Sequence, residues 1–383
     1  MSVSKSTRLG RIEAIDALRG LAALAVVFYH ARQILWVGMV KLYEQYHFQL
    51  RVETLLGYAT LPLHLGWLGV TLFFVLSGYC IHRRGAQNLA ANPHARLNVS
   101  DFARRRLWRI YPTYVAALLF TWIMDWLISS HSGGQSDIGN SDHRWSTLLA
   151  SLVGLQGLVS PMYGSNGVFW TLAMEIHLYL AYPLLYWISQ RYSPKRVLWV
   201  TFIISATFAL ADFFWGIQKA FPYHFVRGPI FLPYWFTWAV GFYLAEAEAG
   251  RAVLPSRKKM IWLAAVGFLG GISLAMFKHY ETSEVFWAVL LGLAVWWSLG
   301  EHGRRIWDSL GGRFAAFVGV FSYSLYAVHL PLVQLFAAYM LPDGSKPYSL
   351  LLCLLGGGFA LIFAWLFFQC VERWSLRRPP SVP

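Results

Sequence analysis

Two residues whose chemistry is unusual in an apolar segment stand near the start of the chain. The run IDALRGLAALAVVFYHARQILWVG carries Arg19 near its beginning and His30 in its second half. Their spacing of 11 residues brings both side chains to one face of a helix, about 16 Å apart along its axis. We expect this face to line a reaction site, where Arg19 holds an anion and the neutral imidazole of His30 accepts a proton. Snorkelling of Arg19 to the membrane surface and a helix–helix hydrogen bond of His30 are the structural alternatives.

Two other ionisable residues lie inside apolar runs further along the chain. Glu175 lies in VFWTLAMEIHLYL, and His329 lies in FSYSLYAVHLP, two residues before Pro331. Such residues within membrane segments indicate a functional site by default, and Pro331 is expected to free a backbone carbonyl. Counted from the ends of their segments, His30, His329 and Glu175 reach a similar depth, which favours one shared site. A buried ion pair for Glu175 and a packing role for His329 stay open.

Two further motifs have side chains suited to an anionic or thin ligand. The run FARRRLWRIYP contains Arg104, Arg106 and Arg109, and guanidinium groups match phosphate oxygens with parallel hydrogen bonds. The alternative is that these arginines only set the membrane orientation. The run GVTLFFVLSGY places Ser77 and Gly78 beside aromatic residues, which permits close approach of either a neighbouring helix or a thin ligand.

The composition places these motifs in a polytopic membrane protein of the all-α class. Of the 383 residues, 57% are hydrophobic and 13% are charged, whereas soluble domains have about 25% charged residues. The shorter apolar segment 145–159 is expected to lie in the membrane interface or to re-enter. Apolar runs that match the thickness of a bilayer predict a bundle of about ten transmembrane helices, at 15–37, 64–82, 111–130, 168–189, 197–216, 229–246, 260–277, 283–299, 314–340 and 348–371.

The distribution of basic residues predicts how these helices are oriented. With a cytoplasmic N-terminus, 23 of the 32 Lys and Arg residues lie in cytoplasmic segments and 7 lie on the opposite side, as the positive-inside rule requires. Both termini are then cytoplasmic, and the chain divides into a tail at 1–10, a transmembrane domain at 11–372 and a tail at 373–383. The net charge of +14 therefore indicates no nucleic-acid partner. The three cysteines have neither disulfide nor metal-ligand spacing.

Several of these motifs, in the same order, resemble the membrane acyltransferase family 3. The resemblance rests on LRGLAALAVVFYH, GVTLFFVLSGY, RRRLWRIYPTY, WTLAMEIHLYLAYPLL and SYSLYAVHLPLV, and it runs from about Arg11 to Glu372. It implies a helical bundle that moves an acyl group, usually acetyl from acetyl-CoA, onto a hydroxyl of a carbohydrate or lipid-linked glycan. In that family the first-helix arginine and histidine are required. Thr171 and His177 depart from the family's usual residues around Glu175.

The resemblance and the residues together predict an acyl-CoA-dependent O-acyltransferase. Acyl-CoA is expected as a co-substrate, with no permanently bound cofactor and no metal. His30 is expected to deprotonate the acceptor hydroxyl as a general base, and an acyl-histidine intermediate stays open. The predicted catalytic residues are His30, Arg19, Glu175 and His329. The predicted donor-binding residues are Arg104, Arg106, Arg109, Ser77, Gly78 and Tyr111, and the predicted acceptor-binding residues are Trp170 and Tyr163.

The expected location is a bacterial inner membrane, and the expected partners are acyl-CoA, a glycan-type acceptor and the lipid bilayer. A transporter or flippase is the competing interpretation, in which the buried Arg, His and Glu line a substrate or proton path. The sequence has no matched pair of interrupted helices in two halves, which that class often shows. An enzyme consumes acyl-CoA, whereas a transporter moves an unchanged solute.

Overall fold

The computed structural model describes residues 5–132, 141–216 and 231–376, without the side chains of residues 5–12, 302 and 304. Within these ranges the regular secondary structure is helical, and one isolated bridge joins Gln156 and Ser160. The predicted all-α class is confirmed. The helices are α1 (Lys5–Leu35), α2 (Met39–Tyr46), α3 (Val52–Ala59), the 3₁₀ turn η1 (Leu61–Leu65), α4 (Leu68–Ala91), α5 (Val99–His131), α6 (Trp145–Leu152), α7 (Phe169–Arg191), α8 (Pro194–Trp215), α9 (Leu232–Glu248), α10 (Arg257–Met276), α11 (Tyr280–Leu299), α12 (Glu301–Trp307), α13 (Leu310–Val320), α14 (Ser322–Met340), α15 (Leu351–Phe367), the π-helical η4 (Phe368–Glu372) and α16 (Arg373–Ser375).

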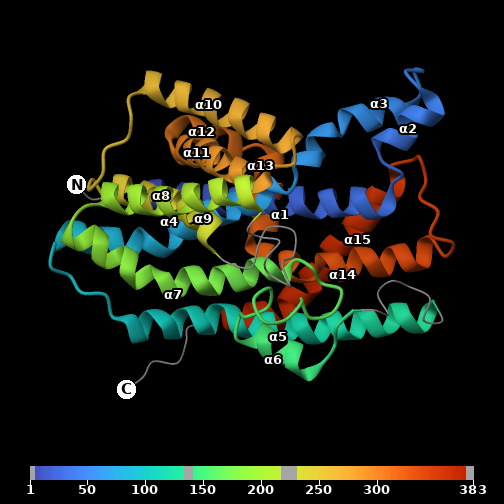
Figure 1. Ribbon diagram of the computed structural model, residues 1–383, viewed down its shortest axis with the longest axis horizontal. Helices are drawn as coiled ribbons and strands as arrows, with labels where there is room; N and C mark the ends of the chain where they lie inside the picture. Colours follow the sequence, from blue (N-terminus) through green and yellow to red (C-terminus); the bar gives the residue numbers. More distant parts are fainter. Residues whose placement is uncertain (1–4, 133–140, 217–230, 377–383) are drawn as a thin grey trace.

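The long helices run lengthwise between two ends of the molecule (Figure 1). Each of the ten predicted spans coincides with at least one of them. Seven segments of the described chain are long and apolar enough to cross a bilayer, and the bent pair α13–α14 is an eighth if it forms one span. This is the architecture of a helical integral membrane protein. The number of helices that cross, and the side on which each terminus lies, stay predictions.

The basic motif lies on a helix and not in the connection before one. The predicted span 111–130 is the second part of α5, which begins about three turns earlier, at Val99. The side chain of Asn98 caps this helix by accepting a hydrogen bond from the Asp101 N–H at 3.0 Å. Asp101 in the first turn pairs with Arg104 at 3.0 Å. These signals for a helix start stabilise the basic segment as the first turns of α5.

The predicted span 314–340 is not one straight helix, because α13 and α14 meet at an angle of 82°. The chain turns at Phe321, which has φ −112° and ψ 18°. The Ser322 hydroxyl donates a hydrogen bond to the Gly319 carbonyl at 2.8 Å. In a continuous helix this carbonyl would instead accept from a backbone N–H. Such local hydrogen bonds of serine compete with helix continuation.

The break creates a new helix start that a buried carboxylate caps. Glu372, from η4, accepts hydrogen bonds from the Ser324 N–H at 3.0 Å and from the Ser324 hydroxyl at 2.6 Å. Its other oxygen accepts from Arg109 of α5 at 2.7 Å. A negative charge at a helix N-terminus is stabilised by the helix dipole and by the free N–H groups there. Glu372 thus joins α5, α14 and the end of the chain's last long helix.

Glycines allow two pairs of helices to meet backbone to backbone. A Cβ on Gly20 of α1 or on Gly319 of α13 would overlap the facing helix backbone, and the same holds for Gly78 of α4 and Gly241 of α9. Small residues at membrane helix interfaces permit such close approach. Gly78 therefore packs against a helix, which was one of its two predicted roles.

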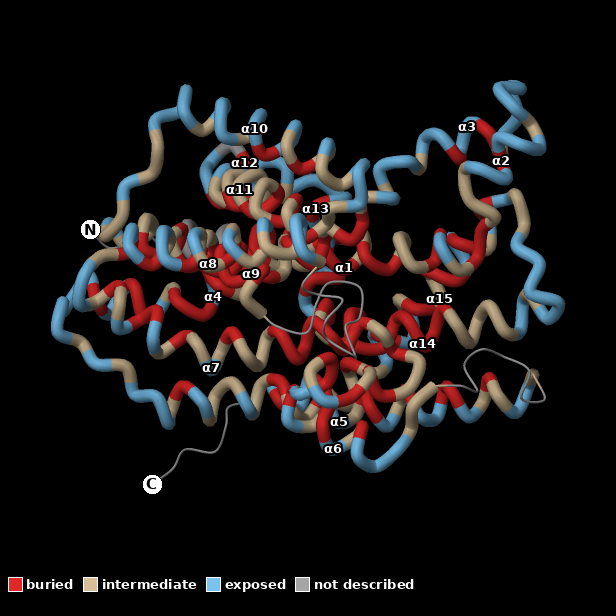
Figure 2. The backbone as a smooth tube through the Cα atoms, in the orientation of Figure 1, coloured by how far each residue is buried: buried red, intermediate tan, exposed pale blue. Residues whose placement is uncertain are grey.

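The most buried elements lie at the centre of the bundle (Figure 2). In α1, 56% of the membrane-length segment is buried, whereas in α10 only 11% of the corresponding segment is buried. Helix α14 is buried along most of its first half, and α10, α2 and α3 are largely exposed (Figure 2). The elements that carry Arg19, His30 and His329 are therefore those that the bundle encloses.

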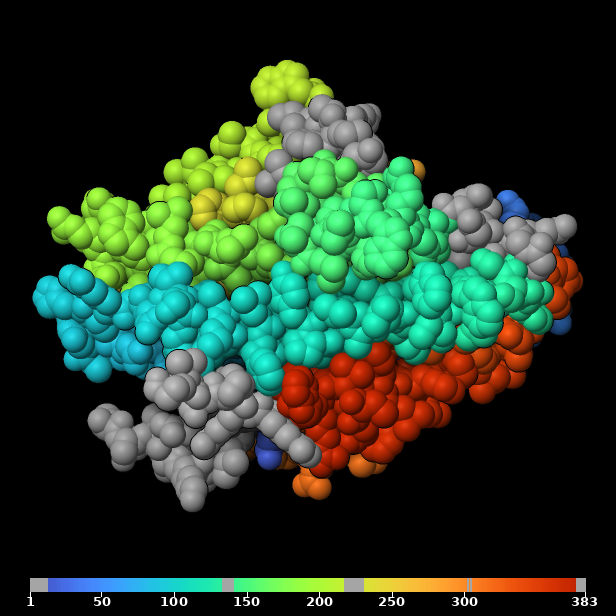
Figure 3. All heavy atoms as spheres, turned by 90° about the horizontal axis from the view of Figure 1, so that it is seen from below, coloured from blue at the N-terminus to red at the C-terminus, as the bar shows by residue number. Residues whose placement is uncertain are grey.

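The segment 141–168 packs on the bundle beside α5. Figure 3 shows α5 crossing one face of the molecule from end to end, with this segment on one side and α15 on the other. The segment contains the short helix α6, and its interfacial or re-entrant position, predicted for 145–159, stays a prediction. Asn166 donates to the Ala327 carbonyl of α14 at 2.9 Å. That carbonyl lacks its helical partner because Pro331 has no N–H, as the sequence predicts.

Candidate active site

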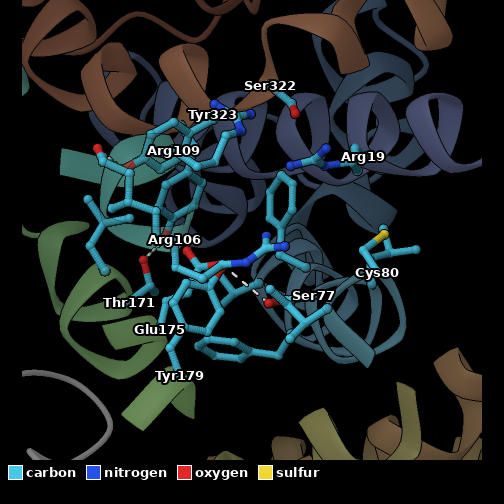
Figure 4. A pocket seen from close by; sticks show the side chains of 18 residues that line it. Arg19, Ser77, Cys80, Arg106, Arg109, Thr171, Glu175, Tyr179, Ser322 and Tyr323 are labelled. Atoms are coloured by element: carbon cyan, nitrogen blue, oxygen red, sulfur yellow. Dashed lines mark hydrogen bonds between the residues drawn. The ribbon is translucent and has the colours of Figure 1, made fainter. Parts of the chain in front are cut away.

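A cavity of about 200 Å³ lies between α1, α4, α5, α7 and α14. Figure 4 shows polar side chains from these helices gathered around it. Predicted residues from four separate motifs line it, namely Arg19, Ser77, Arg106, Arg109 and Glu175. The fold therefore assembles into one cavity the side chains that the sequence placed on four different segments.

The cavity contains two guanidinium groups that form no ion pair within the described chain. Arg109 is paired with Glu372, but no ion pair joins Arg19 or Arg106 to a carboxylate within the described residues. The Nε atom of Arg106 is buried and has no hydrogen-bond acceptor there. Buried polar atoms are normally hydrogen-bonded, and a buried charge is normally paired. This end of the cavity is therefore suited to an anionic ligand.

The cavity wall near these arginines holds a hydrogen-bonded carboxylate. Glu175 of α7 accepts from the Ser77 hydroxyl at 3.3 Å and from the Tyr179 hydroxyl (Figure 4). Ser77 accepts in turn from the indole N–H of Trp238 at 3.2 Å. Glu175 thus lies among the cavity side chains and ties α4, α7 and α9 together.

The two predicted catalytic histidines meet each other. His30 Nδ1 lies 3.0 Å from His329 Nε2, and their ring centroids are 5.1 Å apart. His329 is fully buried, whereas His30 is half-buried. The predicted proximity of these two residues is confirmed. Glu175 is hydrogen-bonded to neither of them, and it lies in the arginine-lined cavity.

Aromatic rings separate the cavity from the histidine pair. Tyr326 lines the cavity, and its ring centroid lies 5.8 Å from that of His329. It also lies 5.6 Å from the Phe73 ring, edge to face, and its hydroxyl is hydrogen-bonded to Thr171 at 3.0 Å. The histidine pair therefore lies just past one end of the cavity, behind Tyr326.

The remaining predicted site residues lie outside the cavity lining. Arg104 pairs with Asp101, and Tyr111 packs at 6.3 Å from the Tyr114 ring. Trp170 belongs to an aromatic cluster in which its ring lies 5.5 Å from that of Tyr234. Gly78 faces α9. In the described chain Arg104 therefore has an ion-pair partner, and Tyr111, Trp170 and Gly78 have packing contacts.

A polar cluster that the sequence analysis missed lies near Tyr163. Asp125, which is 2% exposed, accepts from the Ser165 hydroxyl at 2.5 Å and lies 2.9 Å from His143 Nε2. The hydrogen bond to Asp125 raises the pKa of His143 above its usual value. The Tyr163 ring packs edge to face on His143 at 5.5 Å. Asp125 is a lone acid inside a predicted span, so the criterion that singled out Glu175 also applies to it.

A second missed cluster joins α4, α7 and α9. Glu246 is fully buried and lies 2.8 Å from His82 Nε2, 2.5 Å from the Ser189 hydroxyl and 2.7 Å from Arg251 Nε. Every polar group in this cluster has partners, which is typical of a structural network. Within the described residues no group of three or more His, Cys, Asp or Glu side chains is placed to hold a metal ion.

Comparisons with known proteins agree with these observations. A family model described as an acyltransferase domain matches residues 12–369. A protein named Acyltransferase MdmB, from Streptomyces mycarofaciens, is 27% identical over 218 residues, which are 56% of this chain and 49% of that protein. The chain thus spans about half the length of that relative. A protein named Putative acetyltransferase ORF330, from Acidianus two-tailed virus, is 26% identical over 331 residues, which are 84% of this chain and 83% of that protein. No solved structure matches.

Proposed function

The chain belongs to the acyltransferase family whose domain model it matches over residues 12–369, and from this premise we propose a specific reaction. The protein is an integral membrane O-acyltransferase that moves an acyl group, most simply acetyl, from acyl-CoA to a hydroxyl of a carbohydrate or glycan-type acceptor. The observation that carries this proposal is the cavity with unpaired arginines at one end and a histidine pair past the other. We place the protein in a bacterial inner membrane.

The charge in the cavity supports an acyl-CoA donor. Acyl-CoA carries phosphates at one end and a thioester at the end of a slim pantetheine arm. Arg106 and Arg19 provide guanidinium groups without a carboxylate partner in the described chain, which suits phosphate oxygens. The cavity of about 200 Å³ takes the arm, and the nucleotide lies at the entrance near the start of α5, where Arg104 is placed. The thioester then points towards Tyr326 and the histidine pair.

His30 acts as the general base in this reaction. Its imidazole takes the proton of the acceptor hydroxyl while the hydroxyl oxygen attacks the thioester carbonyl carbon. The tetrahedral intermediate collapses, the carbon–sulfur bond breaks, and the CoA thiolate takes the proton from the His30 imidazolium. The products are the acyl ester and CoA with a free thiol. The acceptor arrives from the side of the bundle that carries segment 141–168, where Tyr163 and Trp170 are the proposed sugar contacts.

Glu175 contributes to the same site through the arginine end of the cavity. Its carboxylate partly balances the charge of Arg19 and Arg106 when no donor is bound, because all three line one cavity. The hydrogen bonds from Ser77 and Tyr179 hold it on the wall. A phosphate group that enters this end therefore meets two guanidinium groups and a carboxylate that already accepts hydrogen bonds from Ser77 and Tyr179.

Acetyl-CoA labelled in its acetyl group tests the proposal in membrane vesicles that contain the protein. His30→Ala is expected to lower acetyl transfer by about 10²–10⁴-fold, because general-base catalysis is lost. Arg19→Ala and Arg106→Ala are expected to raise KM for acetyl-CoA by about tenfold or more, because each removes a charge-assisted hydrogen bond. His94→Ala and Arg96→Ala are matched controls in the exposed connection 92–98 and are expected to behave as the wild type.

Two outcomes contradict the proposal. If vesicles that contain the wild type consume no more acetyl-CoA than empty vesicles when a panel of glycan acceptors is supplied, the result favours the transporter interpretation. If His30→Ala retains full activity at normal protein levels, His30 is not the base.

Cys80 offers a test of donor binding that needs no acceptor. Cys80 and Cys370 are both exposed, but Cys80 lines the cavity whereas Cys370 lies outside its lining. Acetyl-CoA is expected to slow the labelling of Cys80 by a thiol-reactive maleimide and to leave the labelling of Cys370 unchanged. Equal labelling of Cys80 with and without acetyl-CoA contradicts the donor site.

A further inference from the structure

The environment of His329 determines which of its ring nitrogens carries the proton. His329 Nδ1 lies 2.8 Å from the Tyr326 carbonyl oxygen and 3.2 Å from the Leu325 carbonyl oxygen. A carbonyl oxygen only accepts hydrogen bonds, so Nδ1 must be the donor. In a neutral imidazole the other nitrogen then has no proton. His329 Nε2 is therefore a hydrogen-bond acceptor.

This assignment determines the tautomer of His30 as well. His30 Nδ1 lies 3.0 Å from His329 Nε2, and two nitrogens at that distance need one proton between them. Because His329 Nε2 has none, His30 Nδ1 must donate. The remaining nitrogen of a neutral His30, Nε2, then carries the free lone pair.

The neutral form of the His329 ring follows from where it lies. His329 has no exposed surface, and an ionised imidazole there would need a negative partner. The polar partners that the structure gives its ring are two carbonyl oxygens and another histidine. A chain of donors thus runs from His30 Nδ1 to His329 Nε2, and from His329 Nδ1 to the backbone of α14.

We propose that His329 is a positioning residue that holds His30 as the Nδ1–H tautomer, so that His30 Nε2 is the atom that accepts the acceptor's proton. This proposal rests on the proposed acyltransfer and adds an atomic role to it. The backbone carbonyls of α14 take the part that a carboxylate takes when it orients a catalytic histidine. The tautomer of His30 is then fixed without a carboxylate that accepts a hydrogen bond from its ring.

The proton balance of the reaction is consistent with this arrangement. When His30 Nε2 takes the acceptor's proton, the ring becomes an imidazolium that still donates from Nδ1 to His329 Nε2. That hydrogen bond now involves a charge and strengthens. The proton on Nε2 passes to the departing CoA thiolate, and the Nδ1 proton does not need to move. His329 stays neutral through the cycle.

Nitrogen and carbon NMR of labelled histidine measures the tautomers directly in bilayers. In the wild type, His30 is expected to show a protonated Nδ1 and a bare Nε2, with its signal assigned by loss in His30→Gln. In His329→Leu this preference is expected to weaken. A wild-type His30 that is protonated on Nε2 would overturn the proposal. This readout does not depend on whether the protein transfers acyl groups.

Three replacements of His329 separate positioning from packing. His329→Gln keeps an oxygen acceptor near the place of Nε2 and is expected to retain kcat within about tenfold of the wild type. His329→Asn has its amide near the place of Nδ1, and His329→Leu has no acceptor; both are expected to lose about 10²-fold or more in kcat. KM for acetyl-CoA is expected to be unchanged, because His329 does not line the donor cavity.

The pattern of failure identifies which idea is wrong. Equal kcat losses in all three variants, in step with lower thermal stability, mean that His329 only packs, and the positioning role is wrong. A wild type that consumes no acetyl-CoA but has His30 in the Nδ1–H form refutes the acyltransfer and leaves the tautomer assignment standing. A KM change without a kcat change overturns the positioning role.

Discussion

The side chain of Tyr326 contacts the cavity, His329 and Thr171 at the same time. It lines the cavity proposed for the donor, its ring is next to His329, and its hydroxyl is hydrogen-bonded to Thr171. Phe73 packs edge to face against it. In the proposed reaction the thioester carbonyl must pass these rings to reach His30. The two aromatic side chains therefore limit how large an acyl group can occupy this end of the cavity.

Truncation of Phe73 is expected to change the preferred acyl length. Phe73→Ala opens space beside Tyr326, so the ratio of kcat/KM for butyryl-CoA to that for acetyl-CoA is expected to rise by about tenfold or more, the size of effect that pocket methylenes have. Phe120→Ala is the matched control, because Phe120 packs on Phe367 away from the cavity. A ratio that stays constant in folded Phe73→Ala contradicts this role.

At the scale of elements, two helix pairs and one broken helix place the site. Gly78 and Gly241 join α4 to α9, and Gly20 and Gly319 join α1 to α13. The 82° turn between α13 and α14 directs the start of α14 towards the cavity, where Ser322 and Tyr323 line it. The position of Ser77 beside Glu175 thus depends on how closely α4 approaches α9.

A large side chain at Gly78 is expected to separate these helices. Gly78→Leu has to displace the α9 backbone, which the structure places where a Cβ would lie, and overpacking of this kind costs about 1–3 kcal/mol or more. The expected result is a lower thermal unfolding midpoint and less folded protein in detergent, measured by fluorescence and size exclusion. Gly358→Leu, where a Cβ meets nothing within 4 Å, is the control. Similar stability of the two variants would show that the α4–α9 contact is not close.

At the scale of the whole molecule, the connections gather at two opposite ends. Figure 1 shows the connections α4–α5, α7–α8 and α9–α10 at one end, and α2, α3 and the connection α14–α15 at the other. The first end carries most of the basic residues that the sequence analysis assigned to the cytoplasm. The entrance to the arginine-lined cavity is expected on this side, where acyl-CoA is made.

Isosteric serine-to-cysteine changes test this orientation. In a background with Cys80, Cys353 and Cys370 changed to Ser, Ser345→Cys reports on one end and Ser100→Cys on the other, and both positions are exposed. A membrane-impermeant maleimide is expected to label Ser345→Cys in intact cells and Ser100→Cys only after the membrane is opened. The reverse pattern contradicts a cytoplasmic N-terminus, which the positive-inside rule predicts.

The sequence by itself determined the class of the protein and the most informative positions. Hydrophobic runs predicted the helices, because backbone groups in a bilayer must bond within the segment. The 11-residue spacing placed Arg19 and His30 on one face, because helix periodicity is local. Buried charge singled out Glu175, and the same rule applied more widely would have found Asp125. Pro331 predicted a freed carbonyl, since proline lacks an N–H.

Only the tertiary structure decided which of these residues meet. Depth along a span does not specify which neighbours a helix has, so the sequence grouped Glu175 with the histidines, whereas the fold places it among arginines. The 82° turn at Phe321 depends on hydrogen bonds from Ser322 and on the cap by Glu372, which lies about 50 residues further along the chain. The tautomer of His30 likewise depends on a partner from another helix. Contacts between distant segments are set by packing, and a local pattern carries no information about them.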